Sequence, residues 1–182
     1  VSVTVDTLSG RFSPRHAQQP WGRIQLAGTY NHDRLVLDTL RLESPTSRVH
    51  AAGVLPTAIP SGLPRELDLA FSARPLHLRD LGPLLPEGLN DSLRVRAEGA
   101  AQWSRNVLEL QIDVQTDQAG KLALQGRLRE PETGTSQVTL DLNDMDLHTW
   151  GLADLQQRVS LSVEAKGDAL HGWWQGKWTA QT

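Results

Sequence analysis

The side chains that could do chemistry in this chain begin with six histidines. They are His16, His32, His50, His77, His148 and His171. No two of them stand four residues apart with a carboxylate between them, the spacing that places two zinc ligands on one helix face. The sequence also contains no nucleophile elbow and no phosphate-binding loop. It therefore predicts no enzyme, no catalytic residue and no cofactor.

Two smaller groups could hold a metal ion or take part in catalysis. Asp144 and Asp146 flank Met145, but aspartates in a turn are mostly exposed to water. His77 and His148 occupy matching positions before two leucine-rich segments, which fits shared ancestry better than catalysis. We expect neither pair to form a metal or catalytic site.

Tryptophans are concentrated near the end of the sequence. Trp173, Trp174 and Trp178 stand beside Gly172 and Gly176, and in a strand the first two point to opposite faces. Two interpretations remain open: this strand packs against a further repeat, or it forms an aromatic rim on a lipid-binding surface. The other tryptophans, which we expect to cover the ends of a sheet, are Trp21, Trp103 and Trp150.

Composition limits the function further. The net charge is -3 and the pI is near 6.1, so no concentrated basic face is expected and no nucleic acid is predicted as a partner. Cysteine is absent, which excludes disulfides and thiolate metal sites. No apolar run approaches the ~18–20 residues that span a membrane, so we expect a soluble segment. The sequence begins VSVTVD without Met and ends KWTAQT, which is typical of a piece of a longer protein.

Alternation of apolar and polar residues predicts the elements. The apolar positions of these runs are Val1, Val3, Val5, Ile24, Leu26, Leu35, Leu37, Leu40, Leu42, Leu67, Leu69, Phe71, Leu93, Val95, Ala97, Leu108, Leu110, Ile112, Val114, Leu122, Leu124, Val138, Leu140, Leu142, Val159, Leu161 and Val163. Polar residues such as Arg94, Arg96 and Glu98 lie between them, which favours antiparallel strands with one wet face. Helix is expected only as a turn or two within Pro75–Asn90, because two further prolines interrupt that segment.

The chain also repeats itself. SRVHAAGVL (47–55) resembles GKLALQGRL (120–128), with glycines 73 positions apart. In addition, Leu69, Leu76, His77 and Leu81 match Leu140, Leu147, His148 and Leu152 at an offset of 71. We predict one elongated β-repeat domain over 1–182, with approximate units 1–60, 61–130 and a partial 131–182.

These segments resemble those of the TamB and AsmA-like envelope proteins. LVLDTLRLESPTSRVHAAGVL (35–55) is similar to the repeated strand pair of that family, in which the second strand closes on Gly-x-Leu. RPLHLRDLGPLLPEGLNDSLRVRAEGAAQW (74–103) and MDLHTWGLADLQQRVSLSVEAKGD (145–168) are similar to its leucine-rich linkers. The resemblance covers roughly 21–167, and its motifs are degenerate.

The resemblance implies a function as well as a fold. Family members are anchored in the inner membrane, cross the periplasm and fold as a curved β-sheet trough with an apolar interior, similar to bridge-like lipid transfer proteins. It implies a periplasmic protein that shields acyl chains during phospholipid transport and outer-membrane protein assembly. An outer-membrane barrel partner of the TamA type is implied, through parts that this sequence does not contain.

The apolar face is the predicted site. Its expected lipid-lining residues are Leu35, Leu37, Leu67, Leu69, Phe71, Val95, Leu108, Leu110, Ile112, Leu122, Leu124, Leu140, Leu142, Leu161 and Val163. Ala51, Ala97 and Ala165 are expected to leave room for a ligand chain. The alternative is a closed β-sandwich in which the same residues form a dry core, because uncovered apolar side chains cost ~1.5–3 kcal/mol each.

A different class of function remains open. A chaperone-like or structural β-module would capture unfolded strands by adding them to an exposed sheet edge. Such an edge would also permit edge-to-edge self-association.

Overall fold

The described part of the protein is all-β with two short helical turns. The computed structural model describes residues 3–12, 21–31, 34–56, 66–84, 88–116, 119–129, 134–152, 157–168 and 173–181. The strands are β1 (Val3–Phe12), β2 (Trp21–Tyr30), β3 (Arg34–Glu43), β4 (Arg48–Pro56), β5 (Asp68–His77), β6 (Arg94–Ser104), β7 (Val107–Thr116), β8 (Lys121–Arg129), β9 (Ser136–Asp146), β10 (Arg158–Asp168) and β11 (Trp173–Gln181). The turns are the 3-10 helix η1 (Leu78–Leu84) and the α-helix α1 (Leu147–Trp150).

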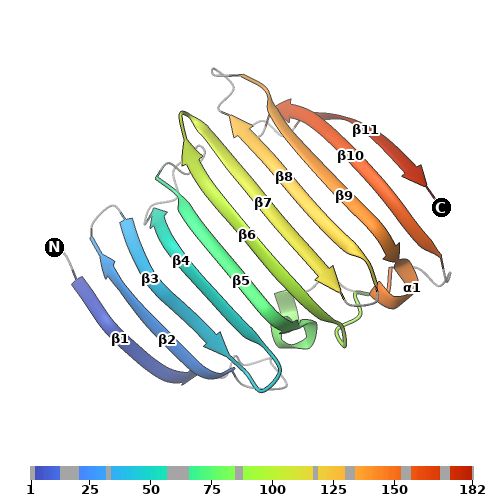
Figure 1. Cartoon of the computed structure of the whole chain (residues 1–182). Coiled ribbons are helices and arrows are strands. Elements are labelled where there is room, and N and C mark those ends of the chain that lie inside the picture. The colour runs from blue at the N-terminus through green and yellow to red at the C-terminus, as the bar shows by residue number, and fades with distance from the viewer. Residues whose placement is uncertain are drawn as a thin grey trace.

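The strands form one curved, open antiparallel sheet (Figure 1). Its eleven strands follow the order of the chain, so that each strand pairs with its neighbours in sequence. β1 and β11 are the two edges and do not pair with each other, which leaves the sheet unclosed. The predicted curved antiparallel sheet is confirmed. The sandwich alternative is wrong for the described part of the chain, because all its strands belong to this single sheet.

Local turn geometry explains the meander. β6 and β7 are joined by Arg105 and Asn106, whose φ angles are 49° and 63°. Positive φ at both central residues is the geometry of a type I′ turn, whose twist matches that of two antiparallel strands. The turn sets Ser104 opposite Val107, and the pairing continues without a shift along both strands.

The pairing separates an apolar face from a polar face. One row across five strands consists of Ala97, Val114, Leu122, Leu142 and Leu161, each directly opposite the next. Directly opposite residues in an antiparallel ladder point to the same side of the sheet. The adjacent row on the other side consists of Glu98, Asp113, Ala123, Asp141 and Ser162.

The only extensively buried cluster in the described residues lies where η1 and α1 meet the apolar face. The cluster is Ala73, Leu76, Leu78, Val95, Ala97, Ala119, Met145 and Trp150. Figure 1 shows η1 beside the end of β5 and α1 beside the end of β9, and these two strands end on the same side of the sheet. Both turns therefore cover one end of the apolar face, here called the crossover end. The predicted short helix within 75–90 is confirmed as η1.

A hairpin turn anchors each helical turn to the sheet. The hydroxyls of Ser44, Thr46 and Ser47, between β3 and β4, donate to one carboxylate oxygen of Asp80 in η1 at 2.6, 2.8 and 2.5 Å. The α1 turn is held differently: the indole Nε1 of Trp150 donates to the carbonyl of Ala119, between β7 and β8, at 2.7 Å. In both places a helical turn is therefore bound to the hairpin turn between two earlier strands, once through a carboxylate and once through an indole N–H.

The two covered regions also contact each other. Asn90, which follows η1, donates from its side-chain amide to the carbonyl of Thr149 at 2.8 Å and from its backbone N–H to that of Trp150 at 2.9 Å. A Cβ built on Gly151 would lie 2.4 Å from the carbonyl oxygen of Gly88, so the two backbones approach closely. The crossover end is consequently one connected structure.

The sequence repeat corresponds to a spacing of four strands. Gly53 lies in β4 and Gly126 in β8, and each stands opposite a leucine of the preceding strand, Leu37 or Leu110. The leucine-rich segments likewise follow β5 and β9. The division into three units stays a prediction, since it assigns boundaries that these pairings do not fix.

Candidate functional site: the apolar face

The sheet brings the predicted lining residues together on one face. Fourteen of the fifteen are placed there by the ladders: Leu35, Leu37, Leu69, Phe71, Val95, Leu108, Leu110, Ile112, Leu122, Leu124, Leu140, Leu142, Leu161 and Val163. Leu67 precedes β5, and its carbonyl accepts a hydrogen bond from the N–H of Trp103 at 2.7 Å. Whether any of them contacts lipid stays a prediction.

The predicted lining set did not include every residue of this face. The further large apolar side chains that the pairings place on it are Ile24, Leu26, Tyr30, Leu40, Leu42, Val49, Leu55, Leu76, Trp103, Val114, Leu128, Val138, Trp174 and Trp178. Several of them continue the two-residue alternation of apolar and polar residues, so the sequence already indicated that they share this face. Trp103 stands opposite Leu108 and fits the expectation that it covers a sheet end.

Burial on this face is uneven. Leu37, Val95 and Leu108 are buried, and the other twelve predicted lining residues are half-buried. Of the half-buried residues, Phe71, Leu122 and Leu142 pack against the buried cluster at the crossover end. The other nine belong to no buried cluster of the described residues. Away from the crossover end the face therefore keeps part of its apolar surface in contact with solvent.

Two of the three alanines that were expected to leave room for a ligand chain are buried. Ala51 and Ala97 are each only 8% exposed. Ala97 belongs to the cluster at the crossover end, and Ala51 stands directly opposite Phe71. The expectation is wrong for these two because both side chains are buried, whereas Ala165 is half-buried.

The polar face is hollowed but carries charges of both signs. A depression of about 1030 Å³ is lined by arginines, Lys121, Glu98 and Asp113, and a second of about 530 Å³ lies over β6–β9. Arg127 pairs with Glu109 at 2.9 Å, and Arg74 pairs with Glu98. These exposed pairs add little stability and keep this face wet.

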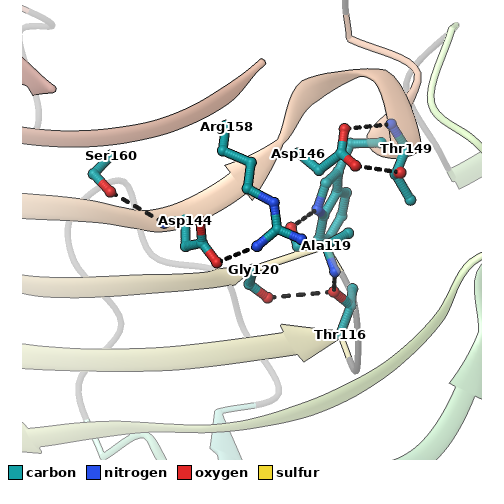
Figure 2. Close-up of polar contacts among 9 residues, drawn as sticks. Thr116, Ala119, Gly120, Asp144, Asp146, Thr149, Arg158 and Ser160 are labelled. Atoms are coloured by element: carbon teal, nitrogen blue, oxygen red, sulfur yellow. Dashed lines mark hydrogen bonds and ion pairs between the residues drawn. The ribbon is translucent and has the colours of Figure 1, made fainter. Parts of the chain in front are cut away.

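The two aspartates flanking Met145 form local contacts, as Figure 2 shows. Asp144 pairs with Arg158 at 2.5 Å. Asp146 is the N-cap of α1 and accepts hydrogen bonds from the N–H and hydroxyl of Thr149 at 3.1 and 2.8 Å. These bonds from Thr149 lower the pKa of Asp146, as expected for a helix cap.

The remaining candidates for chemistry are dispersed. Within the described residues, no three His, Asp or Glu side chains gather closely enough to hold a metal ion. His77 is half-buried and donates its backbone N–H to the Ser47 hydroxyl at 2.8 Å, and His148 is exposed in α1. His16, His32 and His171 lie outside the described residues.

The carboxylate of Asp80 is electrostatically distinct. Burial acts to raise its pKa, but the hydrogen bonds from Ser44, Ser47 and Thr46 outweigh burial and lower the pKa below its ordinary value. With its side chain 6% exposed, Asp80 is an ionised acceptor that holds η1 against the β3–β4 turn. This role is structural and lies at the crossover end.

Comparisons with known proteins do not identify the chain. No protein-family model matches it, and neither do curated proteins or solved structures. Among the described residues, no helix has the length and apolar character needed to cross a membrane.

Proposed function

We propose that this chain is part of a TamB- or AsmA-like envelope protein whose apolar sheet face shields lipid acyl chains. The observation that carries the proposal is the one-sided sheet: apolar side chains line one face from β2 to β11, and no described element covers them beyond the crossover end. A soluble protein rarely leaves so long an apolar surface without a ligand or partner.

Binding of acyl chains requires no catalytic group. Each methylene moved from water onto an apolar surface gains about 0.8 kcal/mol, so a continuous row of leucines suffices to hold a chain. The charged opposite face keeps the protein in water while the ligand is bound. The proposed work is phospholipid transport between inner and outer membranes, together with outer-membrane protein assembly.

Location and partners follow from the resemblance alone. The proposal places the protein in the periplasm, with an inner-membrane anchor and a TamA-like outer-membrane barrel as partner through other parts of the molecule. It assigns the chain no enzymatic activity.

Native mass spectrometry with lipid extraction tests this function. The protein is purified gently from a diderm bacterial host, alongside the double variant Leu69→Asp and Leu140→Asp. Both residues are half-buried on the apolar face. We expect phospholipid to co-purify with the wild-type chain and to be lost from the variant, because two carboxylates would have to be desolvated beside an acyl chain.

A matched variant separates binding from folding. Ala100→Asp and Gln125→Asp introduce the same charges at exposed positions on the polar face, and this protein should keep its lipid. β-type circular dichroism must persist in both variants. A lipid-free wild-type protein, or a Leu69/Leu140 variant that simply unfolds, would mean that the face is only a core.

Strand capture is the second candidate, because among the described residues β11 pairs with β10 only and all of its residues are exposed. It predicts that an extended peptide with alternating apolar residues protects β11 amides from exchange. Strand capture also predicts that the Leu69→Asp and Leu140→Asp changes leave this protection intact, unlike lipid binding.

A further inference from the structure

Across β6–β9 the polar face carries a row of side chains that can donate hydrogen bonds. The strand register sets four such residues opposite one another in turn, namely Arg96, Gln115, Lys121 and Asn143. Directly opposite residues of an antiparallel ladder point to the same side of the sheet, with Cβ atoms about 4.5–5.5 Å apart. All four are exposed, and none is a carboxylate. These four residues form the donor row.

The neighbouring row of the polar face is acidic, but its carboxylates have partners outside the donor row. Glu98 forms its salt bridge with an arginine of β5. Asp113 accepts a hydrogen bond from the side-chain amide of Gln111 at 3.0 Å. Asp141 accepts one from the hydroxyl of Ser162 at 2.6 Å. The positive charges of the donor row therefore remain available to a ligand.

The donor row lies in the larger depression of the polar face. That depression has a volume of about 1030 Å³ and is lined by all four residues of the row, together with Arg94. Four cations and two carboxylates line it, an excess of two positive charges. Within the described residues, no carboxylate pairs with Arg94 or Lys121. The depression thus combines the room of a small-molecule site with unneutralised cations.

We propose that this depression binds a small molecule bearing phosphate groups, held between Arg94 and Lys121. A guanidinium matches two phosphate oxygens at once, and a lysine ammonium binds phosphate as a point charge. The amides of Gln115 and Asn143 can donate to further oxygens. The inference goes beyond the proposed function and does not depend on it, because the depression lies on the face opposite the proposed lipid surface.

The spacing of the two cations fits a ligand with two phosphate groups. Arg94 and Lys121 are separated by two strand spacings and by two residues along the strands, so their Cα atoms lie roughly 12 Å apart. Long side chains reaching inward from both ends leave room for a diphosphate between them. Its negative charge also matches the excess of two positive charges in the depression.

A small molecule fits this site better than a membrane surface does. Basic clusters that bind anionic membranes contain about four to eight Lys or Arg, whereas the excess here is two charges. A bilayer surface is also flat on the scale of one protein, so its headgroups would not fill a hollow. The concave shape and the modest charge together favour a soluble phosphate-bearing ligand.

Isothermal titration calorimetry with inorganic pyrophosphate tests the site on the wild-type chain and on the double variant Arg94→Gln and Lys121→Gln. Both side chains are exposed, so the variant should keep its β-type circular dichroism. We expect one saturable site in the wild type and at least about tenfold weaker binding in the variant, because two charge-assisted contacts are lost. Pyrophosphate has no acyl chain, so this result is independent of lipid binding.

Arg127→Gln with Lys166→Gln is the matched control. It removes the same two charges from the polar face outside the depression, where they pair with Glu109 and Glu164. At about 0.15 M salt, charges more than about 8 Å away are largely screened, so the control should bind pyrophosphate like the wild type. Equal weakening of both double variants would reduce the effect to net charge and overturn the site.

Asp113→Asn provides a test of opposite sign. It removes a negative charge from the depression and leaves an acceptor for Gln111, so pyrophosphate should bind roughly two- to tenfold more tightly. A wild-type chain that does not bind pyrophosphate, or an Asp113→Asn chain that binds it no better, refutes the proposal. Cosedimentation with phosphatidylcholine vesicles containing phosphatidic acid, lost in the Arg94/Lys121 variant and without pyrophosphate binding, would overturn the choice of a small molecule.

Discussion

At the residue scale, small side chains on the apolar face make room for large neighbours within the sheet. Gly99 stands directly opposite Phe71. A Cβ built on Gly99 would lie 2.5 Å from Cε1 of Phe71 and 2.7 Å from the carbonyl oxygen of Gln111. The Phe71 ring therefore occupies the space above the glycine, and at this position the face is closed by the protein itself.

Gly99→Ala should lower the free energy of unfolding by about 1–3 kcal/mol, because both the ring and a backbone oxygen would have to move. Urea unfolding followed by circular dichroism measures the change. Gly126→Ala is the matched control on the same face, since its Cβ would meet only side-chain atoms at 3.5 Å or more. Equal losses in both variants would contradict the role given to Phe71.

At the scale of elements, the helical turns are held by hairpin turns rather than by their own length. α1 has four residues, far below the length at which an isolated helix is stable. Its Trp150 is anchored to Ala119, and η1 is anchored through Asp80 to the β3–β4 turn. The 3-10 helix η1 lies between β5 and β6 and binds the β3–β4 turn, so it connects β3 to β6. In the same way α1 connects β7 to β10.

The Asp80 anchor predicts a dependence of stability on pH. The folded-state pKa of Asp80 is lowered, so its contribution is fully present above the unfolded pKa of about 4 and is lost as pH falls through the lower folded value. Asp80→Asn should destabilise the protein by about 2 kcal/mol at neutral pH, since buried hydroxyls lose a charged acceptor.

Thermal melts between about pH 2 and pH 7 measure this effect. The wild-type chain should lose more stability on acidification than Asp80→Asn does, because the variant lacks the carboxylate whose pKa is lowered by folding. The exposed Asp68→Asn serves as the control and should follow the wild-type curve. Parallel curves for wild type and Asp80→Asn would exclude a role for this carboxylate in acid stability.

At the scale of the whole molecule, stability is distributed along the sheet. Strands β5–β9 carry the buried cluster at the crossover end, whereas β11 has one neighbour and no buried residue. A sheet of this kind has no central core shared by all its strands, so each strand depends on its immediate neighbours.

Amide hydrogen exchange should report that distribution. The amides of β11 should exchange at least about tenfold faster than those of β7, because β11 has a single neighbour in the described sheet and such strands open locally at lower cost. Mass spectrometry of peptic fragments measures both strands in one sample. Uniform protection across the two strands would show that the sheet opens only as a whole.

The antiparallel strands and the sidedness of the sheet could be predicted from the sequence. Side chains alternate between faces with every residue of a strand, so Leu108, Leu110 and Ile112 had to share a face whatever surrounded them. Repeated motifs at a near-constant spacing likewise indicated equivalent strands, because they depend only on the order of residues.

What covers the apolar face could not be predicted, because it depends on contacts between distant segments. The same alternation fits a sandwich and an open sheet, and only the tertiary structure shows a single layer. Ala51 and Ala97 looked like open space in the sequence, yet both are buried in the structure, Ala97 within the cluster at the crossover end. The sequence by itself determined which residues face which side, since that follows from local geometry; the tertiary structure decided where this face is closed and where it is open, since burial arises only when segments far apart in the chain meet.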